Sequence, residues 1–214
     1  YEYDWQDISP GTYAIEAVAT DDDGAKTKST PVSLTVTSSA PTTLVFAGSD
    51  WNYLDDGSDQ GTAWQAPDFD DSSWAIGPAE LGYGDGDEST VVSYGPDPAN
   101  KYPTTYYRHA FDVTDPAAYS YLTLSAKRDD GIVVYLNGTE VFRDNMPSDP
   151  ITYLSYAAGT VQNEGDFVTN NVNAGLLVTG RNVLAAEVHQ ANGTSSDTSF
   201  DLELSGFTGV IVND

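Results

Sequence analysis

The chain has 214 residues, and its 33 acidic against 8 basic side chains give a formal net charge of −25 at pH 7. Such a surface repels phosphate backbones and anionic lipids, so we expect neither a nucleic-acid partner nor membrane insertion. The length suits one sandwich-sized domain with a little left over. The acidity fits solubility in a salty extracellular medium, and equally a place where calcium is plentiful, because that ion takes hard oxygen ligands.

Short runs that alternate apolar and polar residues follow one another along the chain, separated by Gly, Pro, Asn, Asp and Ser. This pattern is typical of β-strands. The runs are residues 11–21, 30–38, 105–113, 121–127, 182–190 and 199–207. No window carries a long stripe of helical period. The sequence therefore predicts an all-β protein, most naturally a sandwich.

The stretch RDDGIVVYLNGTEVFRDN, residues 128–145, contains a β-hairpin signal. Residues 132–136 form a short apolar run rich in β-branched residues, and Asn137-Gly138 is a pair that accepts positive φ at both centres of a tight turn. Asp129 and Asp130 precede the hairpin. Three interpretations of this pair are open: a metal site, half of an acid/base pair, or only the polar residues at the edge of the hairpin.

The first 39 residues resemble the last three strands of a bacterial immunoglobulin-like repeat, in the segments YEYDW and GTYAIEAVATDDDGAKTKSTPVSLTV. The resemblance implies a core of Trp5, Tyr13, Ile15 and Val18. Three strands cannot close a sandwich, because both sheets keep unpaired edges. We therefore expect this segment to be part of a longer chain and to order against a partner: upstream residues, a second copy or the neighbouring domain.

A second resemblance covers most of the remaining chain. FDDSSWAIGPAELGYGDG, TTYYRHAFDV, RDDGIVVYLNGTEVFRDNMP and GRNVLAAEVHQANGTSSDTSFDLEL occur in this order. Together they resemble a galactose-binding-like jelly-roll module of secreted bacterial multidomain proteins, and more loosely the sugar-binding domain of family 2 glycoside hydrolases. The implied fold is a jelly-roll β-sandwich, and the implied location is secreted or at the cell surface.

These two resemblances divide the chain unequally. A Ser/Thr/Pro-rich stretch at 37–43 separates them. We expect a partial immunoglobulin-like segment at 1–39, a linker at 40–43, the jelly-roll at 44–207 and a tail at 208–214.

Catalysis is not expected. Only His109 and His189 are available as imidazoles, there is no cysteine, and no Gly-x-Ser-x-Gly motif occurs. The carboxylates are numerous, but most lie in Asp/Gly/Ser turn runs such as 55–61 and 84–89, where solvated loop structure is the usual outcome.

Alternation along the strands points to a carbohydrate-binding face. If the strands around residues 107, 135 and 187 are neighbours, five side chains share an exposed sheet face. They are Tyr106, Arg108, Tyr135, Glu187 and His189. Aromatic rings can stack on sugars while charged groups bond hydroxyls, although Tyr and Arg also coat sheets for packing and solubility. Trp51 and Tyr83 are further candidates, as loop-tip aromatics that reach solvent. The resemblance to the jelly-roll module implies that Trp74 fills the sandwich core.

Calcium is the expected cofactor. Asp129 and Asp130, with Asp197, are expected at one rim of the sandwich and would offer oxygen ligands. Arg128 or Arg143 would instead neutralise these carboxylates without a metal. A second candidate is Asp21 with Asp23, in the turn DDDG at 21–24, which a plain turn also explains.

The sequence thus predicts a non-catalytic, carbohydrate-binding accessory module stabilised by calcium, whose partners are a polysaccharide and other domains of its parent chain. The alternative is a structural spacer or adhesin module that assembles by β-strand addition, with self-association through residues 1–39.

Overall fold

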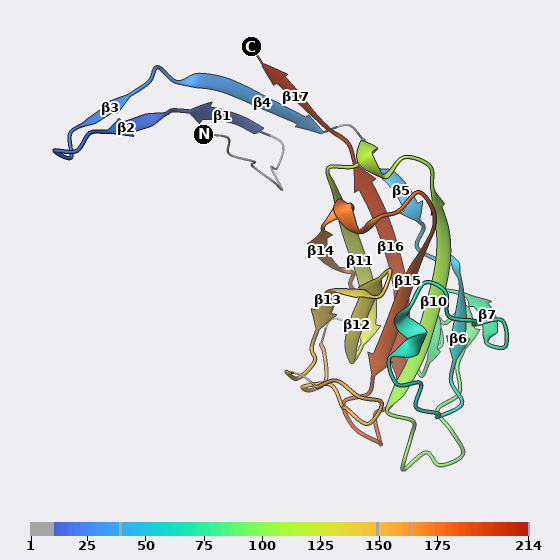
Figure 1. Cartoon of the computed structure of the whole chain (residues 1–214). Coiled ribbons are helices and arrows are strands. Elements are labelled where there is room, and N and C mark those ends of the chain that lie inside the picture. The colour runs from blue at the N-terminus through green and yellow to red at the C-terminus, as the bar shows by residue number, and fades with distance from the viewer. Residues whose placement is uncertain (1–10, 39, 149, 163, 214) are drawn as a thin grey trace.

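A computed structural model describes residues 11–38, 40–148, 150–162 and 164–213, with backbone alone at Ser38 and at 209–213. In this part of the chain the structure is all-β, with three short 3₁₀ turns and no α-helix (Figure 1). The 3₁₀ turns are η1 (Ala63–Gln65), η2 (Pro116–Ala118) and η3 (Ala174–Leu176). None of these described helices is long and apolar enough to cross a bilayer.

Two sheets pack face to face as a β-sandwich, which confirms the predicted fold class. The first sheet has the order β13-β12-β15-β10-β6-β7. In chain order its strands are β6 (Asp50–Leu54), β7 (Ala75–Pro78), β10 (Thr104–Val113), β12 (Gly131–Leu136), β13 (Thr139–Asp144) and β15 (Gly180–His189). All of its pairings are antiparallel.

The second sheet has the order β14-β11-β16-β8-β9, and β5 also pairs with β16. Its strands are β5 (Thr42–Val45), β8 (Leu81–Tyr83), β9 (Thr90–Val91), β11 (Tyr121–Asp129), β14 (Val168–Val172) and β16 (Thr198–Phe207). Long strands β10, β11, β15 and β16 form the centre, where the sequence predicts strands.

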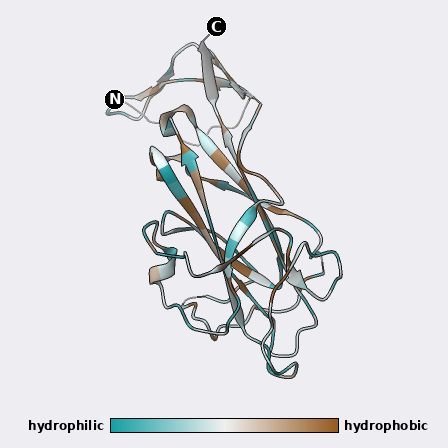
Figure 2. Ribbon diagram, turned by 90° about the vertical axis from the view of Figure 1, so that its right-hand side faces the viewer, coloured by the Kyte–Doolittle hydropathy of each residue, from teal (hydrophilic) through white to brown (hydrophobic). Residues whose placement is uncertain are grey.

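The main core lies between the sheets and follows the predicted parity. Tyr107 is fully buried and stacks on Phe200 of the opposite sheet, with ring centroids 4.1 Å apart. Ile132, Val134 and Leu136 of β12 face the same core. Figure 2 shows the resulting alternation of hydrophobic and hydrophilic residues along the sandwich strands. Burial of these alternate positions is what fixes the register of each strand.

The predicted hairpin is confirmed. Asn137 has φ of 51° and Gly138 has φ of 83°, the positive values that a type I′-like turn requires. The Asn137 amide also donates to the carbonyl oxygen of Leu176, at 2.9 Å, and to Oδ1 of Asn182, at 2.8 Å. The turn is therefore tied to the start of β15 as well as closed locally.

A narrow β arm leaves one end of the sandwich (Figure 1). It comprises β1 (Gly11–Ile15), β4 (Val32–Ser38) and β17 (Gly209–Asn213) in one sheet, extended by the hairpin of β2 (Val18–Thr20) and β3 (Lys26–Lys28). The sequence predicts a tail at 208–214, but β17 pairs antiparallel with β4. A strand of the same chain thus pairs with the first segment, and it is not among the partners expected from the sequence.

The expected core of the arm is largely not formed. Ile15 is 43% exposed and Val18 is 52% exposed, because the described strands of the arm form a single layer and none of them packs over these positions. Tyr13 is half-buried. Trp5, the fourth predicted core residue, lies outside the described residues. The prediction of Ile15 and Val18 as core is therefore wrong.

Candidate functional site

The strands that carry the predicted sugar-binding residues are neighbours, as expected. β10 pairs with β15 and β15 with β12, and Tyr106 lies opposite Glu187 in register. Tyr106 and Tyr135 point to the outer face of the first sheet, away from the main core. The sequence therefore predicts both the adjacency and the face correctly.

The exposure expected for that face is wrong. Tyr106 is 2%, Glu187 5% and Tyr135 8% exposed, and both Arg108 and His189 are fully buried. The loop between β6 and β7 lays Trp64 and Trp74 on this face, and the segment after β13 adds Met146, Ile151 and Tyr153. Two loops thus cover the five predicted side chains, which offer no exposed platform for a sugar in the described part of the chain.

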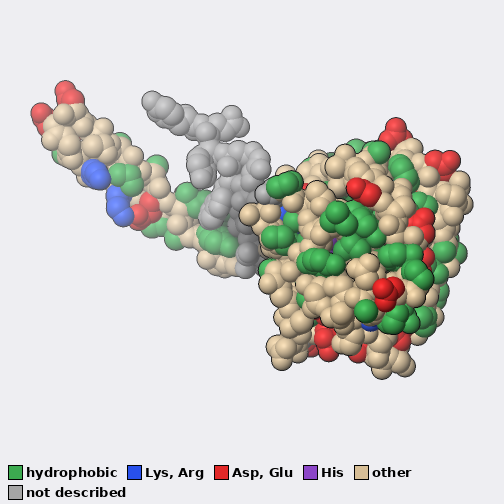
Figure 3. Space-filling view, turned by 90° about the horizontal axis from the view of Figure 1, so that it is seen from below, with side chains coloured by type: hydrophobic (Ala, Val, Ile, Leu, Met, Phe, Trp, Pro, Cys, Tyr) green, Lys and Arg blue, Asp and Glu red, His purple; other side chains and the backbone are tan. Residues whose placement is uncertain are grey.

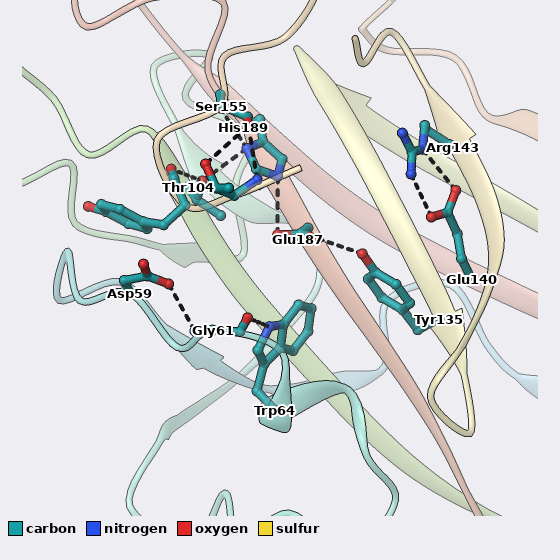
Figure 4. A network of polar contacts seen from close by, with 12 residues as sticks. Asp59, Gly61, Trp64, Thr104, Tyr135, Glu140, Arg143, Ser155, Glu187 and His189 are labelled. Atoms are coloured by element: carbon teal, nitrogen blue, oxygen red, sulfur yellow. Dashed lines mark hydrogen bonds and ion pairs between the residues drawn. The ribbon is translucent and has the colours of Figure 1, made fainter. Parts of the chain in front are cut away.

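Buried polar groups under these loops contact one another (Figure 4), although Nε2 of His189 makes no hydrogen bond in the described structure. The Tyr135 hydroxyl donates to Oε1 of Glu187 at 2.7 Å, and Oε2 of Glu187 lies 3.3 Å from Nε2 of His189. Nδ1 of His189 lies 2.8 Å from the carbonyl oxygen of Ser155, which can only accept, so Nδ1 carries a hydrogen. The network ties β12 and β15 to the covering loop and has the character of a structural core.

Arg108 fastens the other covering loop. Its Nε donates to Oδ2 of Asp71 at 2.8 Å, and its Nη1 donates to the carbonyl oxygen of Trp64. The guanidinium also lies over the Phe69 ring, 5.3 Å from its centroid. An arginine that the sequence presents as a sugar ligand is instead the anchor of the β6–β7 loop.

The loop-tip aromatics are also placed differently from expectation. Trp51 lies in β6, is fully buried and packs edge-on against Phe200, with centroids 4.8 Å apart. Tyr83 lies in β8 and is 7% exposed. Trp74 is buried as expected, but in the outer cluster with Tyr106 rather than in the sandwich core. The prediction that Trp51 and Tyr83 reach solvent is therefore wrong.

Carboxylates gather at the rim of the sandwich opposite the arm, where β11 turns into β12. Asp129 and Asp130 are 2% and 1% exposed there. Oδ2 of Asp130 accepts from the backbone N–H of Ala191 at 2.6 Å and from the Ser195 hydroxyl at 3.1 Å. Burial, followed by the adjacent carboxyl groups of Asp130 and Asp197, raises the pKa of Asp129 to about 9. The expected proximity of these three aspartates is thus observed.

Neither arginine considered as a neutralising partner takes that role in the described ion pairs. Arg128 pairs with Asp144, and Arg143 pairs with Glu140. Oδ2 of Asp129 is buried without a hydrogen-bond partner. Among the described residues the rim carboxylates therefore repel one another with no bridging arginine.

Two further acidic residues join this rim. Asp85, Glu164 and Asp197 offer carboxylate oxygens that all lie within 4.8 Å of one another, a grouping suited to a metal ion. A second grouping, Glu80 with Asp85 and Asp87, shares Asp85. Asp85 lies in the run at 84–89 that the sequence assigns to solvated turn structure, and Glu164 belongs to no motif. Only the fold brings these side chains together.

Two neutral side chains, Tyr83 and Gln190, lie near the same rim. The Gln190 side chain lies beside the Tyr83 hydroxyl. Burial, and then the negative charges of Asp197 and Asp129, raise the pKa of that hydroxyl. Gln190 is 5% exposed, yet its Oε1 and the Tyr83 oxygen make no hydrogen bond of acceptable geometry in the described structure. Buried polar atoms usually find a partner, so these atoms mark a place that offers oxygen ligands.

The other predicted calcium residues, Asp21 and Asp23, lie on the exposed β2–β3 turn. Oδ1 of Asp21 accepts from the backbone N–H of Ala25 at 2.7 Å, which is ordinary turn bonding. Neither of the two groupings of carboxylates found among the described residues includes them. A metal at this turn stays a prediction.

Exposed aromatic rings lie on the same rim. Tyr94 is 38% and Tyr156 39% exposed. Nζ of Lys101 lies 4.9 Å from the centroid of Tyr94, and the neighbouring Asn100 faces Gly193, which also approaches the Tyr156 hydroxyl. We name Tyr94, Asn100 and Tyr156 the rim patch. Figure 3 looks at this end of the sandwich, where hydrophobic side chains gather among acidic ones.

No protein-family model matches the chain, and no curated protein does. Solved structures do resemble it. A glycosyl hydrolase family 2 member from Bacteroides cellulosilyticus matches with a TM-score of 0.50 and 13% identity, over 80% of this chain and 20% of that one. A β-glucuronidase 2 from Bacteroides uniformis matches with a TM-score of 0.48 and 16% identity, over 78% of this chain and 18% of that one.

The chain spans about a fifth of the length of these enzymes. At this identity the first likeness shows the fold alone, a β-sandwich that resembles one part of such a glycosidase. Fold does not by itself give function.

Proposed function

We propose that this chain is a non-catalytic, carbohydrate-binding accessory module, stabilised by calcium, of a secreted or cell-surface multidomain protein. The observation that carries the proposal is the rim patch, which offers two half-exposed tyrosine rings and an amide at one end of the sandwich. Tyrosine rings present an apolar face to a sugar ring and a hydroxyl to its polar groups. The sequence expects binding on the sheet face, and the rim replaces that closed face as the binding site.

The position of the rim supports this proposal. Both β1 and β17 belong to the arm at the opposite end of the sandwich (Figure 1). Other domains of a parent chain joined through the arm would leave the rim free to meet a polysaccharide.

We expect the chain to bind an insoluble or soluble polysaccharide with a dissociation constant between micromolar and millimolar, because the surface is small and shallow. Tyr156→Ala and Tyr94→Ala should each weaken binding about tenfold, since each removes a stacking face. A glycan array, followed by titration calorimetry on the polysaccharide that it identifies, measures both effects.

Phe46→Ala is the matched control, because Phe46 is 65% exposed and follows β5, which pairs with the half of β16 remote from the rim. If Tyr156→Ala, Tyr94→Ala and Phe46→Ala all lose binding equally, the sugar does not bind at the rim patch. Silence across marine and plant polysaccharides would refute the carbohydrate-binding function.

A second candidate function, a spacer or adhesin that self-associates by strand addition, is favoured by the arm. β4 is flanked by β1 and β17, which are the two edge strands of this sheet in the described part of the chain. Open edges bind further strands readily. We expect light scattering to show a concentration-dependent dimer in the full chain, and none in a chain that begins at Pro41. A full chain that stays monomeric at high concentration would exclude this candidate.

A further inference from the structure

We propose that Asp129, Asp197, Asp85 and Glu164 bind one calcium ion at the rim, and that the ion holds the loop of residues 191–197 in the position that the rim patch needs. The coupling to the rim patch rests on the proposed function, whereas the metal site stands without it.

Oxygen atoms without partners point to a ligand at this place. Asp129 and Gln190 are both more than nine-tenths buried. In the described structure neither Oδ2 of Asp129 nor Oε1 of Gln190 makes a hydrogen bond. The carboxyl group of Asp129 abuts that of Asp197, which in turn belongs to the grouping with Asp85 and Glu164. A cation in their midst would satisfy these oxygens and offset the repulsion among four carboxylates.

The rival grouping of Glu80, Asp85 and Asp87 is the weaker site. Glu80 already pairs with Nζ of Lys127, and the same lysine lies 4.0 Å from Asp87. An ammonium thus neutralises part of that charge. For the grouping of Asp85, Glu164 and Asp197, no described ion pair supplies a cation.

The ligand atoms of the proposed site indicate which metal ion it would bind. Every proposed ligand is a carboxylate oxygen, from four side chains, with neither thiolate nor imidazole among them. Zinc prefers nitrogen and sulfur, and magnesium demands a small octahedron of oxygens that it rarely finds in a purely protein site. Calcium accepts six to eight oxygens in irregular geometry, including water at an open side. Asp85 is exposed and Asp197 half-buried, so the site opens to solvent on one side.

The loop of residues 191–197 joins this site to the rim patch. Its Ala191 and Ser195 donate to Asp130, and Nζ of Lys101 donates to the carbonyl oxygens of Ser195, at 2.5 Å, and Ser196, at 3.2 Å. Asp197 ends the loop. A calcium ion on Asp197 would hold the loop from its far end, and Gly193 in the middle lies against Asn100 and the Tyr156 hydroxyl.

The test uses the full chain and terbium(III) as a luminescent substitute for calcium, with calcium itself as competitor. The Tyr83 ring beside the site should sensitise the emission. We expect saturable emission that calcium displaces, and a melting temperature that rises by several degrees with calcium and falls back with chelator at constant ionic strength. No saturable emission and a melting temperature indifferent to chelator would overturn the metal site.

Variants locate the ion. Asp197→Asn and Asp129→Asn should each weaken terbium and calcium binding about tenfold or more, because each replaces a carboxyl ligand, which binds the ion as an anion, by a neutral amide of the same shape. Asp87→Asn tests the rival grouping, and Asp112→Asn, exposed on β10, is the charge-matched control. Both should bind as the native chain does. Loss in Asp87→Asn with none in Asp197→Asn would overturn the assignment.

Glycan titration with and without calcium tests the coupling. We expect chelation to weaken binding about tenfold, a factor that corresponds to 1.4 kcal/mol. Glycan binding that ignores calcium, in a chain whose terbium site is intact, would overturn the coupling alone. A chain that binds terbium and no glycan would refute the proposed carbohydrate function and leave the metal site standing.

Discussion

Replacing Trp51 by alanine will lower the free energy of unfolding by about 3–5 kcal/mol, because it empties the space of a large ring in the close-packed main core. Trp51 is fully buried, packs edge-on on Phe200 at 4.8 Å and lies 5.2 Å from the His109 ring. Urea denaturation followed by circular dichroism measures the loss. Because Trp51 lies between the sheets, glycan affinity measured on the fraction that remains folded should equal that of the native protein.

The exposed Phe46 provides the comparison, since its removal creates no cavity and should cost less than about 1 kcal/mol. A Trp51→Ala protein that keeps its full stability but loses glycan binding would show that this ring reaches solvent and contacts sugar, as the sequence suggests. Equal losses of stability in both variants would mean that the Trp51 ring is not part of the core.

The local sequence pattern is sufficient to predict the strands and which face of each strand a side chain lies on. Tyr107 looks inward and Tyr106 outward because successive side chains on a strand alternate, and alternation is visible in the sequence. The turn at Asn137-Gly138 is equally local. The arm shows the limit: pairing of β17 with β4 joins residues near the two ends of the described chain, and no short-range signal encodes it.

Exposure of a strand face depends on what lies over it, and that is decided at long range. Tyr106 is closed off by Trp64, whose loop arrives from β6, and by Tyr153, which follows β13. A loop rich in Asp and Gly looks solvated in the sequence, yet three aromatic residues in it turn inward. The large aromatics in the β6–β7 loop are the signal that such a segment packs on the sheet rather than extending from it.

The acidic rim is predictable from the sequence only in part, because some of its residues are placed locally and others meet only through the fold. Asp129 ends β11 and Asp130 follows it, so their position at the rim follows from local structure. Asp85 and Glu164 come from separate loops, and their meeting with Asp197 depends on how β8 and β16 pair. Acidic residues are so common in turns that the sequence pattern does not distinguish metal ligands from ordinary turn residues.

The second large effect concerns the anchor of the covering loop. Asp71→Ala will destabilise the protein by about 3 kcal/mol, because it leaves the guanidinium of Arg108 buried without its counter-ion. The Arg108 side chain is 0% and that of Asp71 18% exposed, and Nη2 of Arg108 already has no hydrogen-bond partner in the described structure. Denaturant melts give the energy, and the red shift of tryptophan emission reports whether Trp64 and Trp74 lose their cover.

Two companion variants make the cause of that loss plain. Glu16→Ala removes half of an ion pair in which the Lys28 side chain is 64% exposed, and solvent screening should limit its cost to less than about 1 kcal/mol. Arg108→Met in the Asp71→Ala background removes the unpaired buried charge while keeping an unbranched apolar chain against Phe69. It should recover part of the lost stability. If Asp71→Ala alone costs no more than Glu16→Ala, the aromatic rings rather than the ion pair hold the loop on the sheet.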